Sequence, residues 1–329
     1  MSPEMAELLR VEGVKKYFRV KRGLGFSKAW LKAVDGVSFG IGRGEILSLV
    51  GESGCGKSTL GRIALNLIAP TAGRVFFEGA ELTGLSEEQM RPLRERMQII
   101  FQNPYSSLNP RMRIRDILME PLTTHRALTS RLELERTAAG LLEKVGMRGD
   151  ALTRFPHEFS GGQRQRIGIA RAIALQPDLV VCDEPLSALD VSIRSQVINL
   201  LCALKEELGL TYLFISHDLS VVRYLSDRIC VMYLGRIVET GTSGEVFGNP
   251  LHPYTQSLIA ATPIPNPHLR GRQRVLLQGE IPSPIAPPSG CRFRTRCRMA
   301  KPLCAEAEPP EPTGRKHAAA CHFNRGECQ

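Results

Sequence analysis

Short, continuously apolar runs alternate with segments of helical periodicity along the first 250 residues. The runs at 45–50, 98–101, 179–182 and 214–215 are hydrophobic almost throughout, which is typical of strands that are buried on both faces of a parallel sheet. Between residues 103 and 172, apolar residues instead recur three and four positions apart. One such set comprises Leu134, Ala138, Leu141, Leu142 and Val145. The pattern predicts an α/β core with an inserted helical subdomain at about residues 103–172.

This regularity ends near residue 250. A turn bounded by prolines leads into a short predicted helix that contains Leu258 and Ile259. Further prolines then recur too often for a long helix, because proline removes a backbone donor and disrupts a helix interior. They are Pro263, Pro265, Pro267, Pro282, Pro284, Pro287 and Pro288. We therefore expect two domains, residues 1–250 and an extended, largely non-helical C-terminal extension at 251–329, called the tail below.

Composition narrows the classes that fit. The chain has 329 residues, 43% of them hydrophobic, and a formal net charge of +10, which excludes fibrous and wholly disordered proteins. The tail carries 11 Lys and Arg against 5 Asp and Glu, and holds 12 of the 22 prolines and five of the nine cysteines. Since the positive charge belongs mainly to one segment, a nucleic-acid partner is not expected. No apolar run approaches the roughly 18 residues of a membrane span, and the start lacks a signal-peptide core, so we expect a soluble, cytoplasmic chain.

A glycine-rich loop that fits the pattern G-x-x-x-x-G-K-[ST] follows the first apolar run, and helical spacing resumes from Leu60 to Leu67. Strand, loop and helix in this order form a phosphate site, because glycines let backbone N–H groups surround phosphate oxygens at a helix N-terminus. Lys57 would reach the β- and γ-phosphates of a nucleotide, and Ser58 would ligate Mg²⁺. The loop consists of Gly51, Glu52, Ser53, Gly54, Cys55, Gly56, Lys57, Ser58 and Thr59.

Two carboxylates, Asp183 and Glu184, end the apolar run at 179–182. A buried strand that delivers acidic residues at its carboxyl end places them where open α/β sheets bind ligands. Asp183 is expected to hold Mg²⁺, and Glu184 to polarise the attacking water. Together with the phosphate loop, this pair predicts a P-loop nucleoside triphosphatase.

A third motif opens an arginine-rich helical segment and comprises Ser160, Gly161, Gly162 and Gln163. It resembles the signature motif of the ATP-binding cassette (ABC) ATPases, with Phe159 in place of the usual leucine. The resemblance covers roughly residues 8–250 and implies an ABC-type P-loop fold that binds ATP and Mg²⁺. It also implies that the signature of one subunit closes on the γ-phosphate held by another, so that one chain cannot complete its own site.

The remaining ABC motifs follow in order. Gln102 resembles the Q-loop glutamine that contacts Mg²⁺ and senses the membrane partner, and residues 187–190, which end in Asp190, resemble the D-loop that communicates across the dimer. His217 resembles the switch histidine that contacts the γ-phosphate and helps to position the catalytic glutamate. Phe18, after a short predicted strand, is expected to stack on adenine, with Tyr17 as the alternative.

Two segments narrow the resemblance to one branch of the family. Residues 101–111 are similar to the segment after the Q-loop in peptide importers, near which the ATPase receives the coupling helix of a permease. Residues 249–258 are similar to the opening of the C-terminal extension of dipeptide, oligopeptide and nickel importer ATPases. The resemblance implies a peripheral subunit on the cytoplasmic face of the membrane that hydrolyses ATP to energise import of di- or oligopeptides. Its expected partners are a second ABC ATPase in a heterodimer, two membrane permeases and, indirectly, a substrate-binding protein.

Four cysteines gather in the tail with the spacing C-x5-C-x6-C-x16-C, namely Cys291, Cys297, Cys304 and Cys321. Disulfides are not expected in a reducing cytoplasm, and the spacing does not choose among tetrahedral zinc, an iron–sulfur cluster and four inert thiols. The C-R-F-x2-R-C and C-H arrangement resembles the [4Fe–4S] site of peptide-importer ATPases, which favours a cluster that serves as a structural staple or a redox sensor. His317 and His322 keep a mixed zinc site open, and Cys328 is left over.

The sequence leaves other functions open. An ABC ATPase that acts on nucleic acid would suit the basic tail, although such proteins usually carry a long coiled coil, a zinc module or two cassettes. An exporter is disfavoured by the His-Pro-Tyr segment of the tail. Import of nickel or another solute is not excluded, because substrate choice belongs to the binding protein and the permeases.

Overall fold

The computed structural model describes residues 7–21, 28–103, 107–125, 130–261, 279–312, 314 and 316–323. The described chain separates into two compact units. The first unit contains residues 42–45 and 84–215, and the second contains 7–41, 46–83 and 216–323. The expected boundary at residue 250 falls within the second unit, and the division into 1–250 and 251–329 stays a prediction.

Three parallel strands form the centre of the first unit in the order β8-β7-β6. They span Met97–Ile100 (β6), Leu179–Asp183 (β7) and Thr211–Ser216 (β8). Every residue of β7 and β8 is buried. The continuous apolar runs are therefore strands covered on both faces, as their lack of alternation predicts.

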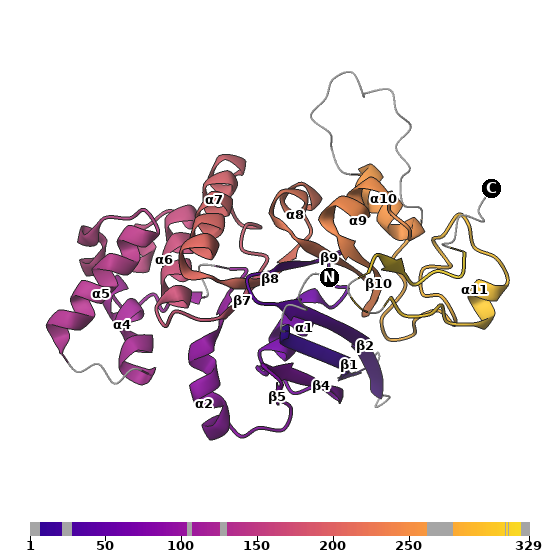
Figure 1. Ribbon diagram of the computed structural model, residues 1–329, viewed down its shortest axis with the longest axis horizontal. Coiled ribbons are helices and arrows are strands. Elements are labelled where there is room, and N and C mark those ends of the chain that lie inside the picture. The colour runs from indigo at the N-terminus through magenta and orange to yellow at the C-terminus, as the bar shows by residue number, and fades with distance from the viewer. Residues whose placement is uncertain are drawn as a thin grey trace, which may run out of the picture. The chain divides into compact units, whose positions relative to one another are not determined.

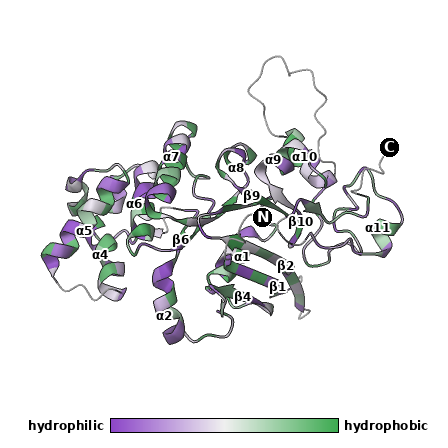
Figure 2. Ribbon diagram, viewed as in Figure 1, coloured by the Kyte–Doolittle hydropathy of each residue, from purple (hydrophilic) through white to green (hydrophobic). Residues whose placement is uncertain are grey.

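Helices make up the rest of the first unit and confirm that residues 103–172 are largely helical. Figure 1 shows α4, α5 and α6 side by side, and they pack against one another. α5 buries Leu134, Ala138, Leu141 and Leu142, the face that the sequence predicts. α2 buries only Met90 and is largely hydrophilic (Figure 2). The helices are α2 (Glu87–Arg96), α4 (Ile114–His125), α5 (Arg131–Lys144), α6 (Gly161–Ile173) and α7 (Val191–Leu208), with 3-10 turns at Gly149–Thr153 and Pro156–Glu158.

The second unit holds two groups of strands. The first group has the order β11-β10-β9-β3, with β3 parallel to β9 and the other pairs antiparallel. Its members are β3 (Ile46–Val50), β9 (Arg228–Tyr233), β10 (Arg236–Thr242) and β11 (Ala318–Ala319). The second group has the order β2-β1-β4-β5. Its members are β1 (Glu7–Lys21), β2 (Lys28–Gly42), β4 (Ala72–Phe77) and β5 (Ala80–Glu81).

The helix predicted after the phosphate loop is present as α1 (Lys57–Ala64), and the left-handed φ of 51° at Asn66 ends it before Leu67. One local expectation about the second unit is wrong. Phe18 lies within β1 and not after a short strand, since β1 extends to Lys21.

The other helices of the second unit are short. They are α8 (Leu219–Leu225), α9 (Ser243–Gly248), α10 (Pro253–Ala261) and α11 (Leu303–Glu306). α10 is the short helix expected around Leu258, and the small extent of α11 agrees with a largely non-helical tail. Among the described residues, no helix is both long and apolar enough to cross a membrane. Pro104–Ser106 of the segment after the Q-loop, Pro263, Pro265, Pro267 and Cys328 lie outside the described residues.

The tail packs into the second unit through an aromatic cluster. The Tyr233 ring lies 4.7 Å from that of Tyr254 and 5.3 Å from that of Phe293, measured between ring centroids. Phe293, from the tail, is only 2% exposed. The tail also adds β11 to the edge of β10, where Ala319 pairs with Glu239. Residues far apart in sequence therefore share one core.

We expect Phe293→Ala to lower the free energy of unfolding by about 3 kcal/mol, because it leaves a cavity among packed aromatic rings. Phe293→Leu, which fills more of the space, should cost clearly less. Urea denaturation of the full chain, followed by circular dichroism, measures both. Equal stability of Phe293→Ala and the wild type would mean that the cluster does not hold the tail.

Candidate nucleotide site

The phosphate loop, in the second unit, has a shape that two glycines impose. Gly51 and Gly56 have φ values of 153° and 107°. A Cβ atom on either would lie 2.1 Å from a backbone oxygen, that of Met232 or that of Ala33. No other residue fits there without displacing β-strand backbone, so the predicted requirement for glycine has a steric cause.

The side chain of Lys57, the one cation of the loop, is buried and turned towards the loop backbone. Lys57 is the first residue of α1 and is only 4% exposed. Its ammonium group donates to the carbonyl oxygens of Gly51 at 2.8 Å and Glu52 at 3.0 Å. Burial raises the pKa of Cys55, which keeps it a neutral thiol. Ser58 and Thr59 follow Lys57 in the first turn of α1.

In the first unit, the structure brings Gln102 and Glu184 together. The Gln102 side-chain amide donates to a Glu184 carboxylate oxygen at 2.9 Å. Glu184 has a positive φ of 46°, its N–H donates to the Ile215 carbonyl at 3.0 Å, and its own carbonyl accepts the Ser187 hydroxyl at 3.0 Å. Strained backbone persists only where its surroundings hold it, and it gathers at functional sites. The expected catalytic carboxylate is thus fixed beside the expected Q-loop glutamine, one residue after buried Asp183.

The signature motif begins α6 as predicted. The Ser160 hydroxyl accepts the Gln163 N–H at 3.3 Å, and the Gln163 side chain accepts the Ser160 N–H at 3.0 Å. This capping box fixes the start of a 13-residue helix, whose N-terminal N–H groups favour anions. A Cβ atom on Gly162 would lie 2.5 Å from the Ile193 side chain, so a larger residue there would have to displace Ile193. Gly161 is the first residue of α6, and Asp190 is the exposed N-cap residue of α7.

The two adenine candidates differ in their surroundings. The Tyr17 hydroxyl donates to buried Asp35, and burial, together with this hydrogen bond, raises the pKa of Tyr17 to about 12. Tyr17 is therefore tied into the protein by its polar end. Phe18 is half-buried, with the Lys16 ammonium 5.3 Å from its ring centroid. Of the expected residues, Phe18, the phosphate loop and exposed His217 belong to the second unit, whereas Gln102, the signature, Asp183, Glu184 and Asp190 belong to the first.

The tail contacts the phosphate loop, which the sequence does not indicate. The Tyr254 hydroxyl accepts the Glu52 N–H at 2.9 Å. The two terminal nitrogens of Arg296 donate to the two carboxylate oxygens of Glu52 at 2.7 and 3.0 Å. Arginines between the first two tail cysteines were visible in the sequence, but nothing in it indicated their partner.

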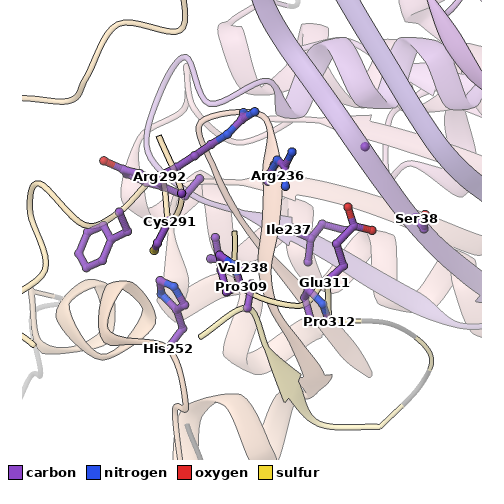
Figure 3. Close-up of a pocket in the computed structure, with 15 residues that line it drawn as sticks. Ser38, Arg236, Ile237, Val238, His252, Cys291, Arg292, Pro309, Glu311 and Pro312 are labelled. Atoms are coloured by element: carbon purple, nitrogen blue, oxygen red, sulfur yellow. The ribbon is translucent and has the colours of Figure 1, made fainter. Parts of the chain in front are cut away.

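A single cavity is lined by four of the tail cysteines, together with His252 and His322 among others: Cys291, Cys297, Cys304 and Cys321. Burial raises the pKa of Cys291 to about 11, and the other three cysteines act in the same direction. The four thiols converge, yet within the described ranges no group of three or more His, Cys, Asp or Glu side chains is placed to hold a metal ion. A neighbouring cavity also includes Cys291, and Figure 3 shows Cys291, Arg292 and His252 on one side of it and Ser38 and Glu311 on the other.

A buried polar group anchors the start of the tail. Glu239 is fully buried and accepts the backbone N–H groups of Leu251 at 2.9 Å and His252 at 2.8 Å, while His317 approaches it at 2.9 Å. The His252 ring accepts the Tyr254 N–H at 3.1 Å. Burial lowers the pKa of His252 to about 3, so the ring is neutral.

Comparison with known proteins places these features in a family. The family described as ABC transporter matches residues 34–187, and the one described as oligopeptide/dipeptide transporter, C-terminal region, matches residues 238–304. The chain is 52% identical to the oligopeptide transport ATP-binding protein AppF of Bacillus subtilis, over 96% of this chain and 97% of that protein. It is 52% identical to the dipeptide transport ATP-binding protein DppF of Haemophilus influenzae, over 93% of each.

Solved structures agree on the fold. The dimeric, post-hydrolysis structure of the ATP-binding cassette MJ0796 bound to ADP and Pi is 28% identical and superimposes with a TM-score of 0.64, over 71% of this chain and 98% of that one. The predicted class, an ABC-type P-loop fold with a helical insert, is confirmed.

Stability should fall between pH 7 and pH 5 because of His252. The unfolded chain takes up this proton near pH 6.5 and the folded chain only near pH 3, so acid favours the unfolded state by about 2 kcal/mol at pH 5. His252→Asn keeps an acceptor for the Tyr254 N–H but cannot be protonated, and should lose about 2 kcal/mol less than the wild type over this range. Urea denaturation at both pH values measures the difference.

The matched control is His157→Asn, which alters an exposed histidine. It should keep the wild-type pH dependence. Identical losses for the wild type and His252→Asn would show that His252 is protonated in the folded chain.

Proposed function

Because the chain belongs to the ABC transporter family, among the oligopeptide and dipeptide transport ATP-binding proteins, we propose that it hydrolyses ATP to drive import of small peptides through a membrane transporter. The observation that carries this proposal is that peptide-transport ATP-binding proteins match 96% and 93% of the chain, so that the match includes both the cassette and the tail. The importer-type tail also contacts the phosphate loop through Tyr254 and Arg296. Nickel or another solute is the alternative cargo.

In this proposal the phosphate loop holds the nucleotide. Loop N–H groups and the N-terminus of α1 bind the β- and γ-phosphates, and the Lys57 ammonium exchanges its loop carbonyls for phosphate oxygens. Ser58, Asp183 and Gln102 are the oxygen donors for Mg²⁺, which neutralises phosphate charge when bound. Phe18 stacks on adenine, since the hydroxyl of its neighbour Tyr17 is committed to Asp35.

Hydrolysis depends on Glu184. Its carboxylate orients water towards the γ-phosphorus and accepts a proton as the new P–O bond forms and the bond to the ADP oxygen breaks. The hydrogen bond from Gln102 supports this role, because it couples the base to a residue that would report on Mg²⁺ and the membrane partner. His217 contacts the γ-phosphate and helps to position Glu184.

A second ATPase subunit completes the site. The α6 N-terminus, with Ser160, Gly161, Gly162 and Gln163, would bind the γ-phosphate held by that partner, and Asp190 would transmit its state across the dimer. We favour a related but different chain as the partner. Two permeases would receive the motion at the cytoplasmic face of the membrane, and a binding protein would deliver peptide to them.

We also propose a soft-metal centre at Cys291, Cys297, Cys304 and Cys321, a [4Fe–4S] cluster before zinc. Support comes from four thiols that line one cavity, a donor set that suits soft metals. Binding would replace four protons and draw the sulfur atoms to ligating distance. The centre would hold the proline-rich tail in place or respond to redox conditions.

Glu184→Gln should bind MgATP normally but hydrolyse it at least about 100-fold more slowly, because the amide cannot accept a proton. In cells that lack the corresponding subunit, the wild-type gene should restore uptake of a labelled tripeptide and Glu184→Gln should not. The control is Glu206→Gln, which changes an exposed carboxylate and should match the wild type.

Either of two results would contradict the assignment. Near-normal hydrolysis by Glu184→Gln would remove the catalytic role of that residue. Restored uptake of nickel, but not of the tripeptide, would show that the transported substrate is a metal ion and not a peptide.

Anaerobically purified protein should contain about four iron and four sulfide per chain and absorb visible light. Cys297→Ser should lose both, while Cys202→Ser, on α7, should retain them. Colourless wild-type protein with zinc would establish the zinc alternative, and folded protein with neither metal would refute the centre.

A further inference from the structure

The turn between Cys291 and Cys297 is built into the second unit. Three of its five intervening residues are buried: Arg292 is 8% exposed, Phe293 2% and Arg296 9%. Backbone hydrogen bonds tighten the turn, with Arg296 N–H donating to the Phe293 carbonyl at 2.9 Å. Arg292 donates to Asp35 and to the Leu234 carbonyl. The turn therefore has little freedom to move independently.

Arg296 projects from this turn onto the phosphate loop. Its guanidinium binds both carboxylate oxygens of Glu52, at 2.7 and 3.0 Å, and also donates to the Tyr233 hydroxyl at 3.5 Å. The Arg296 side chain is 5% exposed and that of Glu52 23%. A two-pronged pair with this little solvent is much stronger than a surface ion pair. The hydrogen bonds to Glu52 raise the pKa of Arg296, which therefore stays charged.

Glu52 is an unfavourable residue for a loop that binds phosphates. An unpaired carboxylate here would repel the nucleotide, and the repulsion would be strong because a partly buried charge is poorly screened. Arg296 neutralises that charge. The Tyr254 hydroxyl accepts a hydrogen bond from the backbone N–H of Glu52 at 2.9 Å. The tail thus controls both the charge and the backbone of Glu52.

We propose that Arg296 is a positioning residue for ATP binding, which acts by neutralising and fixing Glu52 of the phosphate loop. The inference concerns nucleotide affinity and does not depend on which cargo is transported. Arg296 itself touches Glu52 rather than the nucleotide. Arg296 lies next to Cys297. Any interaction that holds Cys297 in place therefore also holds Arg296, the residue that neutralises Glu52.

A double-mutant cycle on the full chain tests the proposal, with MgATP affinity measured by titration calorimetry. Arg296→Gln should weaken binding about tenfold, since Glu52 is then unpaired. Glu52→Gln should bind as well as the wild type or more tightly. The double variant Glu52→Gln with Arg296→Gln should recover affinity to within about twofold of the wild type. Arg294→Gln is the matched control: the Arg294 guanidinium donates to the carbonyl and hydroxyl of Ser289 instead of to the phosphate loop, so this variant should leave affinity unchanged.

Salt dependence separates charge from structural damage. If the defect of Arg296→Gln is electrostatic, the ratio of its Kd for MgATP to that of the wild type should shrink as KCl rises from 50 to 500 mM. An unchanged affinity in Arg296→Gln would overturn the proposal. So would a defect that persists undiminished in the double variant, because it would then arise from misfolding of the turn and not from the Glu52 charge.

Discussion

The ion pair between Glu52 and Arg296 joins the phosphate loop to a turn 244 residues further along the chain. Removing two charges from water is costly, and the pair is stable only because its geometry is two-pronged and neighbouring groups contribute. Tyr233 and Tyr254 provide these contacts on the two sides. Two features therefore stabilise the phosphate loop. Its glycines allow a backbone shape that other residues cannot adopt, and Arg296 of the tail neutralises the charge of Glu52, the one acidic side chain in the loop.

A second buried charge connects the tail to the strand that carries the adenine candidates. Burial alone would raise the pKa of Asp35, but the hydrogen bond from Tyr17 and the positive charge of Arg292 hold it below its usual range. Arg236 adds a further positive charge at 3.9 Å. Arg292 and Arg296 stand four residues apart in one cysteine-bounded turn, so the tail supports β1 and the phosphate loop with the same short segment. An extension that looks like an appendage in composition is thus part of the nucleotide-binding unit.

Much of this could be predicted from the sequence, for identifiable reasons. Parallel strands buried on both faces leave continuous apolar runs, so the sequence predicts β3, β6 and β7 with nearly correct bounds. The run at 214–215 marks only the end of β8, which starts at Thr211. The capping box at Ser160 is local and also legible. What the sequence did not reveal is non-local: the partner of Arg296, the burial of Phe293 between two tyrosines, and the neutral His252. Helical spacing does not reveal the end of α1 either, because it continues to Leu67, whereas the single left-handed residue Asn66 ends the helix.

Coupling between ATP hydrolysis by this chain and peptide import can be measured in lipid vesicles. The chain is reconstituted with its partner ATPase and permeases, and ATP hydrolysis is measured with peptide-loaded and with peptide-free binding protein. Peptide-loaded binding protein should accelerate ATP hydrolysis several-fold over the peptide-free form, and the acceleration should disappear without the permeases. An equal rate of ATP hydrolysis with peptide-loaded and peptide-free binding protein would contradict the coupling to peptide import.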